Sequence, residues 1–260
     1  MSIRDTTIGN SVGRLLTSNG NRLVELWDEY ATAGYEKVYL THSTRKLRKG
    51  MSQLFLPSDS GKFFDAGCGT GGMFETITQR ISPVELYGGD WSEEMLKKAQ
   101  IEAERLRNTS KTCFNLLRID LSKPLPWPDG FFDGAVSNLV ICYLPYGWKE
   151  PLIELRRVIK PGGYLYLSTF LEEWDFDSAL WKFAPKEFIR DPHGTLYGIR
   201  FRRIASEISK KAKRLGAELP PRDELTSFLE ILGFEDMNTV PAYWGFGLAL
   251  RAKVISKPLS

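Results

Sequence analysis

A chain of 260 residues, 42% of them hydrophobic and 26% charged, holds enough apolar material for one large α/β domain with additions. This balance excludes an intrinsically disordered protein. The formal charge of +3 is too small for a whole-molecule field that would require nucleic acid or an anionic membrane as partner, so local basic clusters are judged separately.

The cysteines and the amino terminus bear on the compartment. Cys68, Cys113 and Cys142 are odd in number and widely spaced, which indicates neither a disulfide framework nor a metal site. Polar residues interrupt the amino-terminal segment, where a signal peptide needs an apolar run, and no stretch is long enough for a membrane span. We therefore expect a soluble cytoplasmic protein without a metal ion, either a monomer or a homodimer.

The predicted elements begin with two helices. Apolar residues recur at helical spacing over residues 21–30, and a second, basic helix is expected over residues 36–55. We interpret residues 1–56 as a helical lid, and we expect its deletion to abolish function more than it weakens the fold. Residues 57–260 are predicted to form the main domain.

Short apolar strands then alternate with helices, which predicts βαβ units and a mostly parallel sheet. The helix before the fifth strand is expected to end at Pro161-Gly162-Gly163. The alternation lapses over residues 171–221, an aromatic and basic segment that we interpret as an inserted cap. A helix over residues 225–232 follows the cap. The expected strands are Lys62–Asp65, Glu85–Gly88, Phe114–Ile119, Phe132–Asn138, Tyr164–Phe170, Phe234–Val240 and Gly245–Ile255.

A glycine-rich loop follows the first strand, where backbone amides approach a ligand closely. The spacing of Gly67, Gly69 and Gly72 satisfies the GxGxxG pattern of dinucleotide-binding proteins, which is a weak signal alone. Asp65 favours S-adenosylmethionine (SAM) over NAD, because a carboxylate attracts the sulfonium and ammonium groups of SAM and repels a pyrophosphate. The predicted cofactor residues of this loop are Asp65, Gly67, Cys68, Gly69 and Gly71.

Two further acidic residues end the next two strands. Asp90 lies where a carboxylate accepts hydrogen bonds from the ribose hydroxyls of either cofactor. Asp120 is expected to accept from the adenine amine, Leu121 to pack beside the ring, and Trp91 to cover its other face. Alternatively, the carboxylates are helix caps or exposed strand ends, and Trp91 packs under the following helix.

Four motifs follow one another between residues 63 and 170: FFDAGCGTGG, LYGGDWSEEML, RIDLSKPLPWPDGFFDGAVSNLVICYL and ELRRVIKPGGYLYLSTF. In this order they resemble the class I SAM-dependent methyltransferases, and among them the ubiquinone and menaquinone biosynthesis methyltransferases. The resemblance implies a Rossmann-like α/β fold with helices on both faces of a seven-stranded sheet of order 3-2-1-4-5-7-6, with strand 7 antiparallel. It also implies that the loop glycines approach the methionine part of SAM and that Asn138 is a cofactor residue, which faces the methionine moiety and the methyl-transfer site.

The acceptor is expected to be a small, partly apolar or aromatic molecule that is methylated on oxygen, nitrogen or carbon, leaving S-adenosylhomocysteine. We assign Tyr30, Tyr143, Trp174 and Trp181 to its pocket, although ordinary core packing is the alternative. His193, in the cap, is the candidate base for a phenol or alcohol acceptor, whereas a lone histidine is more often structural. An amine or an activated ring carbon needs positioning alone.

Three other functions stay open. Basic residues recur at helical spacing over residues 200–214, which is typical of a solvated helix face but also of a phosphate-binding face in an RNA methyltransferase. Against methylation of nucleic-acid bases, Asn138-Leu139-Val140 lacks the Pro-Pro-aromatic run of those enzymes. An NAD-dependent oxidoreductase and a catalytically inactive SAM-binding scaffold are the remaining alternatives.

Overall fold

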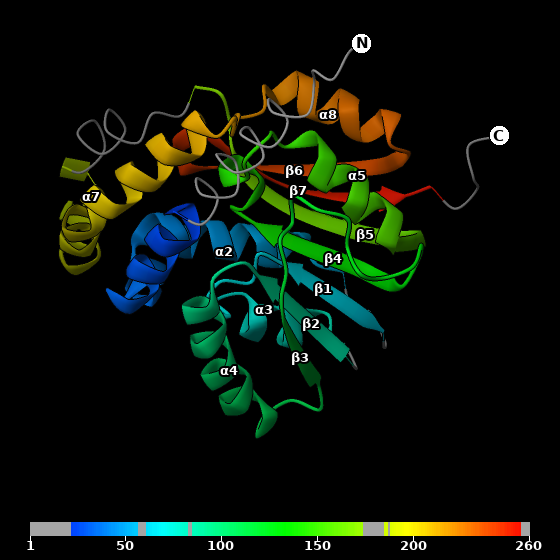
Figure 1. Ribbon diagram of the computed structural model, residues 1–260, viewed down its shortest axis with the longest axis horizontal. Helices are drawn as coiled ribbons and strands as arrows, with labels where there is room; N and C mark the ends of the chain where they lie inside the picture. Colours follow the sequence, from blue (N-terminus) through cyan, green and yellow to red (C-terminus); the bar gives the residue numbers. More distant parts are fainter. Residues whose placement is uncertain (1–21, 57–60, 83–84, 174–184, 187, 256–260) are drawn as a thin grey trace, which may run out of the picture.

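A seven-stranded sheet forms the centre of the computed structural model (Figure 1). The structure describes residues 22–56, 61–82, 85–173, 185–186 and 188–255. The strand order is β3-β2-β1-β4-β5-β7-β6, with β7 antiparallel to β5 and β6 and the other pairs parallel, so the predicted order and reversed strand are confirmed. The strands are β1 Lys62–Ala66, β2 Glu85–Asp90, β3 Cys113–Arg118, β4 Phe132–Asn138, β5 Ile159–Phe170, β6 Phe234–Ala242 and β7 Gly247–Val254.

Three helices cover one face of the sheet. They are α2 (His42–Leu54), α3 (Phe74–Arg80) and α4 (Glu93–Arg107). α2 contributes Leu47, Met51 and Leu54 to the same core cluster as residues of β5, β6 and β7, and Met51 is fully buried. Deleting residues 1–56 would therefore also expose this face of the sheet, and the expectation that the deletion affects function more than the fold stays a prediction.

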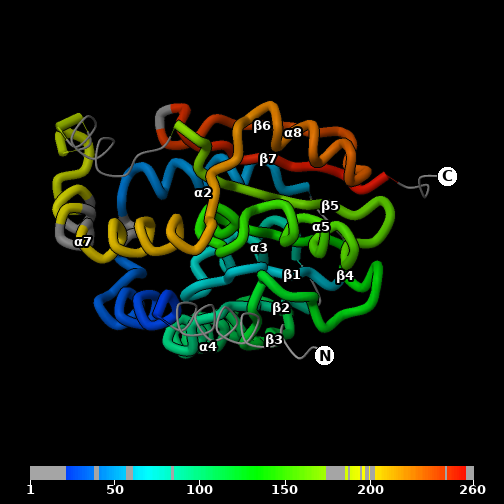
Figure 2. The backbone as a smooth tube through the Cα atoms, turned by 45° about the horizontal axis from the view of Figure 1, so that its top comes forward, coloured from blue at the N-terminus to red at the C-terminus, as the bar shows by residue number. Residues whose placement is uncertain are grey.

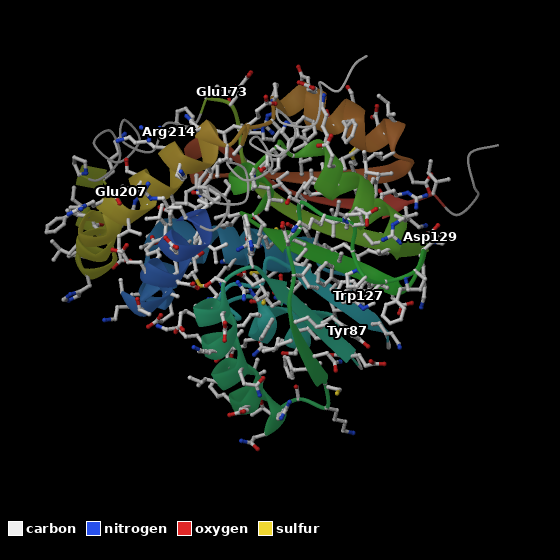
Figure 3. The ribbon with its side chains drawn as sticks, in the orientation of Figure 1. Tyr87, Trp127, Asp129, Glu173, Glu207 and Arg214 are labelled. Atoms are coloured by element: carbon white, nitrogen blue, oxygen red, sulfur yellow. The ribbon has the colours of Figure 1, made fainter. Side chains whose placement is uncertain are left out.

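The other face is covered by α5 (Lys149–Val158), α8 (Arg222–Ile231) and the segment between β3 and β4. That segment, residues 119–131, contains no helix. Its Trp127 packs over the sheet instead, 5.9 Å from the ring of Tyr87 on β2 and 4.8 Å from Phe64 on β1 (Figure 3). The sheet is thus buried on both sides, as a mostly parallel sheet requires.

A third group of elements lies across the carboxyl ends of the parallel strands. It consists of a helix over residues 22–32, the short 3₁₀ helix η1 (Tyr35–Leu40) and the long helix α7 (Pro192–Arg214) (Figure 2). Leu23 and Tyr30 of the first helix form one cluster with Ile208 and Leu215 of α7. The predicted lid thus contains two parts, since residues 22–40 pack with the cap and α2 packs on the sheet.

Two predicted boundaries differ from the structure. The helix expected over residues 36–55 is interrupted at Thr41, whose hydroxyl accepts a hydrogen bond from the amide of Thr44 and caps α2. α5 ends at Val158, and β5 begins at Ile159, so Pro161 and the glycines lie inside a strand. The register between β4 and β5 shifts at this point, which lets the irregular residues remain in the sheet. Within the described ranges, no helix is long and apolar enough to cross a membrane.

Candidate functional site

The glycine loop joins β1 to α3 and turns back over β2. The amides of Gly67 and Cys68 both donate to the carbonyl oxygen of Gly89, at 2.8 and 3.0 Å. Gly67 has a φ of +76°, and a side chain there would place its Cβ 2.4 Å from Val140. Only glycine gives this turn and this close approach, so the loop is built for tight packing at the strand end.

Asp90 ends β2 beside this loop. One carboxylate oxygen accepts from the amide of Gly69 at 2.8 Å, and the other accepts from the amide of Ser92 at 2.9 Å. Burial raises the pKa of Asp90 to about 6, while the amide hydrogen bonds act in the opposite direction. The carboxyl is therefore held in one orientation and is ionised at neutral pH.

Asp65 lies one strand away, beneath the loop. It is only 1% exposed, and its Oδ2 atom has no hydrogen-bond partner. Burial, followed by the charge of Asp90, raises the pKa of Asp65 to about 8. Asp65 is therefore protonated at neutral pH, and Asp90 carries the negative charge that attracts a cationic group and repels an anionic one.

A cavity opens in front of Asp90, with about 640 Å³ of empty space that includes its open mouth. Asp90 is the one acidic or basic side chain among the described residues that line it. The others are apolar, aromatic, glycine or amide residues: Leu23, Trp27, Tyr35, Gly67, Gly69, Trp91, Met95, Ile119, Leu121, Asn138, Leu139, Val140, Tyr143 and Leu144.

The helix over residues 22–32 is hydrogen-bonded to the amino terminus of α4, beside this cavity. Its Asp28 accepts hydrogen bonds from the hydroxyl of Ser92, at 2.5 Å, and from the amide of Glu94, at 3.3 Å. Ser92 also caps α4 by accepting from the amide of Met95. A carboxylate at the amino terminus of α4 is favourable for the helix dipole, so this contact holds the lid against the site.

Aromatic rings form the wall between the lid and the sheet. Trp27 packs edge to face on Tyr143, with ring centroids 5.5 Å apart, and Tyr35 lies 6.2 Å from Trp27. Tyr30 stacks behind Trp27 and contacts Tyr35 at 4.9 Å. Burial raises the pKa of Tyr143 well above its usual range, so its hydroxyl stays protonated at neutral pH.

The segment after β4 enters the cavity in a strained conformation. Leu139 has a φ of +58°, which is unusual for a residue with a branched side chain. The hydroxyl of Ser168 fixes this turn, since it donates to the Oδ1 atom of Asn138 at 2.7 Å and accepts from the amide of Leu139 at 3.1 Å. Backbone strain of this kind concentrates at functional sites.

The predicted cofactor residues divide into two groups. Gly67, Gly69, Asp90, Trp91, Leu121 and Asn138 line the cavity, as does Tyr143 of the predicted acceptor pocket. Asp65, Cys68, Gly71 and Asp120 lie outside this lining. Cys68 belongs to the core on the α3 side, and a Cβ on Gly71 would meet Phe74 at 2.9 Å. Asp120 accepts from the amide and hydroxyl of Ser122 and pairs with Lys123.

The predicted acceptor residues are only partly described. Tyr30 is buried behind Trp27 and does not line the cavity. Trp174 and Trp181 lie outside the described residues. His193 is exposed near the start of α7, about four helical turns before the part of α7 that packs on the lid, and it too is absent from the cavity lining. Its assignment as a base therefore gains no support from the geometry.

Sequence reasoning missed most of the lid residues at the site. Leu23 and Trp27 fit a helical pattern and were interpreted as helix core, while Asp28 and Tyr35 carried no motif. A polar residue beside an amphipathic stripe is the signal that would identify Asp28, but its partner is Ser92, 64 positions away. Such a pair becomes visible only when the lid is folded onto α4.

Comparison with known proteins shows what this chain is similar to. Residues 64–167 match the family model of the methyltransferase domain. The chain is 31% identical over 161 residues to a malonyl-[acyl-carrier protein] O-methyltransferase of a Marinomonas species, covering 61% of this chain and 53% of the relative. It is 30% identical over 116 residues to a ubiquinone/menaquinone biosynthesis C-methyltransferase of Burkholderia mallei, covering 44% and 45%.

Over residues 64–167 the chain is thus similar to the methyltransferase domain. It spans about half the length of the curated relatives it matches. Solved structures share the fold of this chain at low identity. A SAM-dependent methyltransferase of Thermotoga maritima superposes with a TM-score of 0.58 at 20% identity, covering 90% of this chain and all of the other. The geranyl diphosphate C-methyltransferase of Streptomyces coelicolor, crystallised with S-adenosylhomocysteine, gives 0.55 at 13%, covering 82% and 79%.

Proposed function

We propose that this chain transfers the methyl group of SAM to a small, partly apolar or aromatic acceptor. The observation that carries the proposal is Asp90, held by the amides of Gly69 and Ser92 at the mouth of an otherwise apolar and aromatic cavity. A fixed carboxylate beside a glycine turn suits a ribose, and the walls suit an adenine ring.

The residues present fit SAM better than NAD. Asp90 carries a negative charge at the cavity, which favours a cationic amino acid group and disfavours a pyrophosphate. Asp65 lies outside the cavity lining, and its buried, unpartnered oxygen would add a second negative charge when a cationic group binds nearby. Ile119 and Leu121 supply apolar surface further along the cavity. SAM, when bound, supplies a methyl group activated by the positive charge on sulfur.

The chain's own residues then bind the cofactor, orient the acceptor and exclude water. Gly67, Gly69 and Asp90 would hold the cofactor, while Asn138 and Tyr143 are placed to orient the acceptor. The lid helix, fastened through Asp28, would keep water out of the site. Fixing two reactants in line lowers the barrier because little motion remains to be lost in the transition state.

The cavity offers little to a mechanism that needs a base. No histidine, lysine or cysteine is found among its described lining residues, and the Tyr143 hydroxyl stays protonated. We therefore favour acceptors that are nucleophilic without help, such as a neutral amine or an activated ring carbon, over an alcohol. The same lining, with no cation, disfavours carboxylate and phosphate acceptors.

Transfer of a labelled methyl group from SAM tests this proposal. We expect label in small aromatic amines or electron-rich rings, and far less in alcohols, carboxylates or RNA. The variant Asn138→Ala should lower kcat on the best acceptor with little change in SAM affinity, if Asn138 orients the acceptor. Label that appears mainly in RNA would favour the alternative in which the basic residues of α7 bind phosphates.

A further inference from the structure

The cap exposes apolar side chains at the end farthest from the sheet. Among the described residues, eight large hydrophobic side chains are exposed, and four of them lie within residues 188–199. They are Phe188 at 46%, Ile189 at 82%, Leu196 at 54% and Ile199 at 48% exposure. Figures 1 and 2 both show the start of α7 at the outer edge of the molecule, away from the strands.

The same helix carries a basic stripe that continues this apolar surface. Leu196, Ile199 and Arg203 fall on one face of α7, at spacings of three and four residues. Further along that face lie Glu207, Lys210 and Arg214, all exposed, and Figure 3 labels Glu207 and Arg214 along the helix. Glu207 is paired with Arg203 at 3.0 Å, and basic side chains outnumber acidic ones among the ionisable residues named on this face.

We propose that this surface, which we call the α7 outer face (Phe188, Ile189, Leu196, Ile199, Arg203, Lys210 and Arg214), docks on an anionic lipid membrane. Aliphatic side chains at one end and cations along one side match the interface of a charged bilayer, where the former enter the acyl boundary and the latter meet the headgroups. Four exposed apolar residues within residues 188–199 are consistent with an interaction surface, since exposed apolar patches mark such sites.

Lipid fits this surface better than nucleic acid does. A phosphate backbone would engage the arginines and lysines, but it offers nothing to Ile189, Leu196 or Ile199, and single-stranded bases stack on aromatic rings, of which the face has one. This docking goes beyond the proposed methyl transfer, because it assigns a lipid surface as a partner of the chain.

Co-sedimentation of the full chain with vesicles tests the docking without any turnover. Vesicles of phosphatidylcholine with phosphatidylglycerol should bind the wild type, and pure phosphatidylcholine vesicles should bind it much less. The double variant Leu196→Ser/Ile199→Ser should reduce binding to anionic vesicles roughly tenfold or more. Arg203→Gln/Lys210→Gln should reduce it roughly tenfold, and binding should fall as salt rises.

Ile101→Ser/Ile231→Ser is the matched control, because these isoleucines are 68% and 72% exposed but lie on α4 and α8. This control should bind vesicles like the wild type, and all variants should keep the wild-type melting temperature and SAM affinity. The proposal is overturned if anionic and neutral vesicles bind equally, or if the control loses as much binding. Tighter binding to RNA than to anionic vesicles, or a dimer that Leu196→Ser/Ile199→Ser dissociates, would assign the face to another partner.

Discussion

Asp65 is buried, and its ionised form is costly in the unliganded chain. An ionised carboxyl with an unpartnered oxygen at 1% exposure is costly, and the chain lowers this cost by raising the pKa of Asp65 to about 8. A cationic ligand group nearby would return the pKa toward its ordinary value. The residue therefore reports on both the empty and the loaded site.

The Asp65→Asn variant should change how stability depends on pH. The carboxyl titrates near 4 in the unfolded chain and at about 8 when folded, so wild-type stability falls as pH rises through this window. Asparagine loses no proton, so the stability gained by the variant should grow by on the order of 3 kcal/mol between pH 6 and pH 8. Urea unfolding of the unliganded chain measures this.

The exposed residue Asp129 supplies the control, since its side chain is 84% exposed. Asp129→Asn should leave the pH profile of unfolding unchanged. If the free energy of unfolding depends on pH in the same way in Asp65→Asn and in the wild type, the pKa of Asp65 is not raised in the folded chain.

Asp90 should determine how the affinity for SAM changes at acidic pH. Its pKa of about 6 means that the carboxylate, which we propose accepts from the ribose hydroxyls, is lost as the pH falls below 6. The affinity for SAM should then decline by up to about tenfold per pH unit. In Asp90→Asn the affinity should be lower throughout and should lack this decline, as measured by the Kd of SAM between pH 5 and pH 7. A decline that persists in the variant belongs to another group.

For individual residues, the sequence predicts a place at the site where that place depends on nearby positions in the chain. Gly67, Gly69 and Asp90 follow strand ends in a known order, and the structure brings them to one cavity. Asp120 follows a strand end too, yet its carboxyl is engaged by Ser122 and Lys123 in the structure, so its adenine contact stays a prediction. Local hydrogen bonds of this kind compete with a ligand and do not show in spacing.

The lid helix depends on one polar contact at the amino terminus of α4. Asp28→Ala removes the acceptor for the Ser92 hydroxyl and the Glu94 amide, so we expect a loss of about 1–2 kcal/mol in unfolding free energy. Because the lid covers the cavity, SAM should also dissociate faster, as stopped-flow fluorescence of Trp27 and Trp91 would record. Glu25→Ala, at an exposed position of the same helix, should change neither quantity.

At the level of elements, hydrophobic periodicity and turn residues were sufficient to predict most strands and helices. They did not predict the surface on which each helix packs. α2 was grouped with the lid because it precedes the glycine loop, whereas its apolar stripe of Leu47, Met51 and Leu54 lies on the sheet. A stripe indicates that a helix packs, but it does not name the surface. A truncation that tests the lid should therefore stop before α2, for example by removing residues 1–34.

For the whole molecule, the order of the strands followed from four motifs, because these motifs occur in one topology. The cap was predicted only as a lapse in the pattern, and α7 within it is placed by contacts with residues 22–40 that sequence spacing does not encode. The described lining of the cavity includes Leu23, Trp27 and Tyr35 of the lid, whose placement depends on these contacts with α7. That is why the reaction can be inferred from the chain while the acceptor needs a panel of candidates.

Isothermal titration with SAM, S-adenosylhomocysteine and NAD, on the wild type and on Asp90→Ala, tests the central claim most directly. We expect both adenosyl compounds to bind, NAD to bind at least tenfold more weakly, and the substitution to weaken SAM by roughly tenfold or more, since it removes a charge-assisted acceptor. Binding of NAD in preference to SAM, or equal SAM affinity in the two chains, would contradict the account.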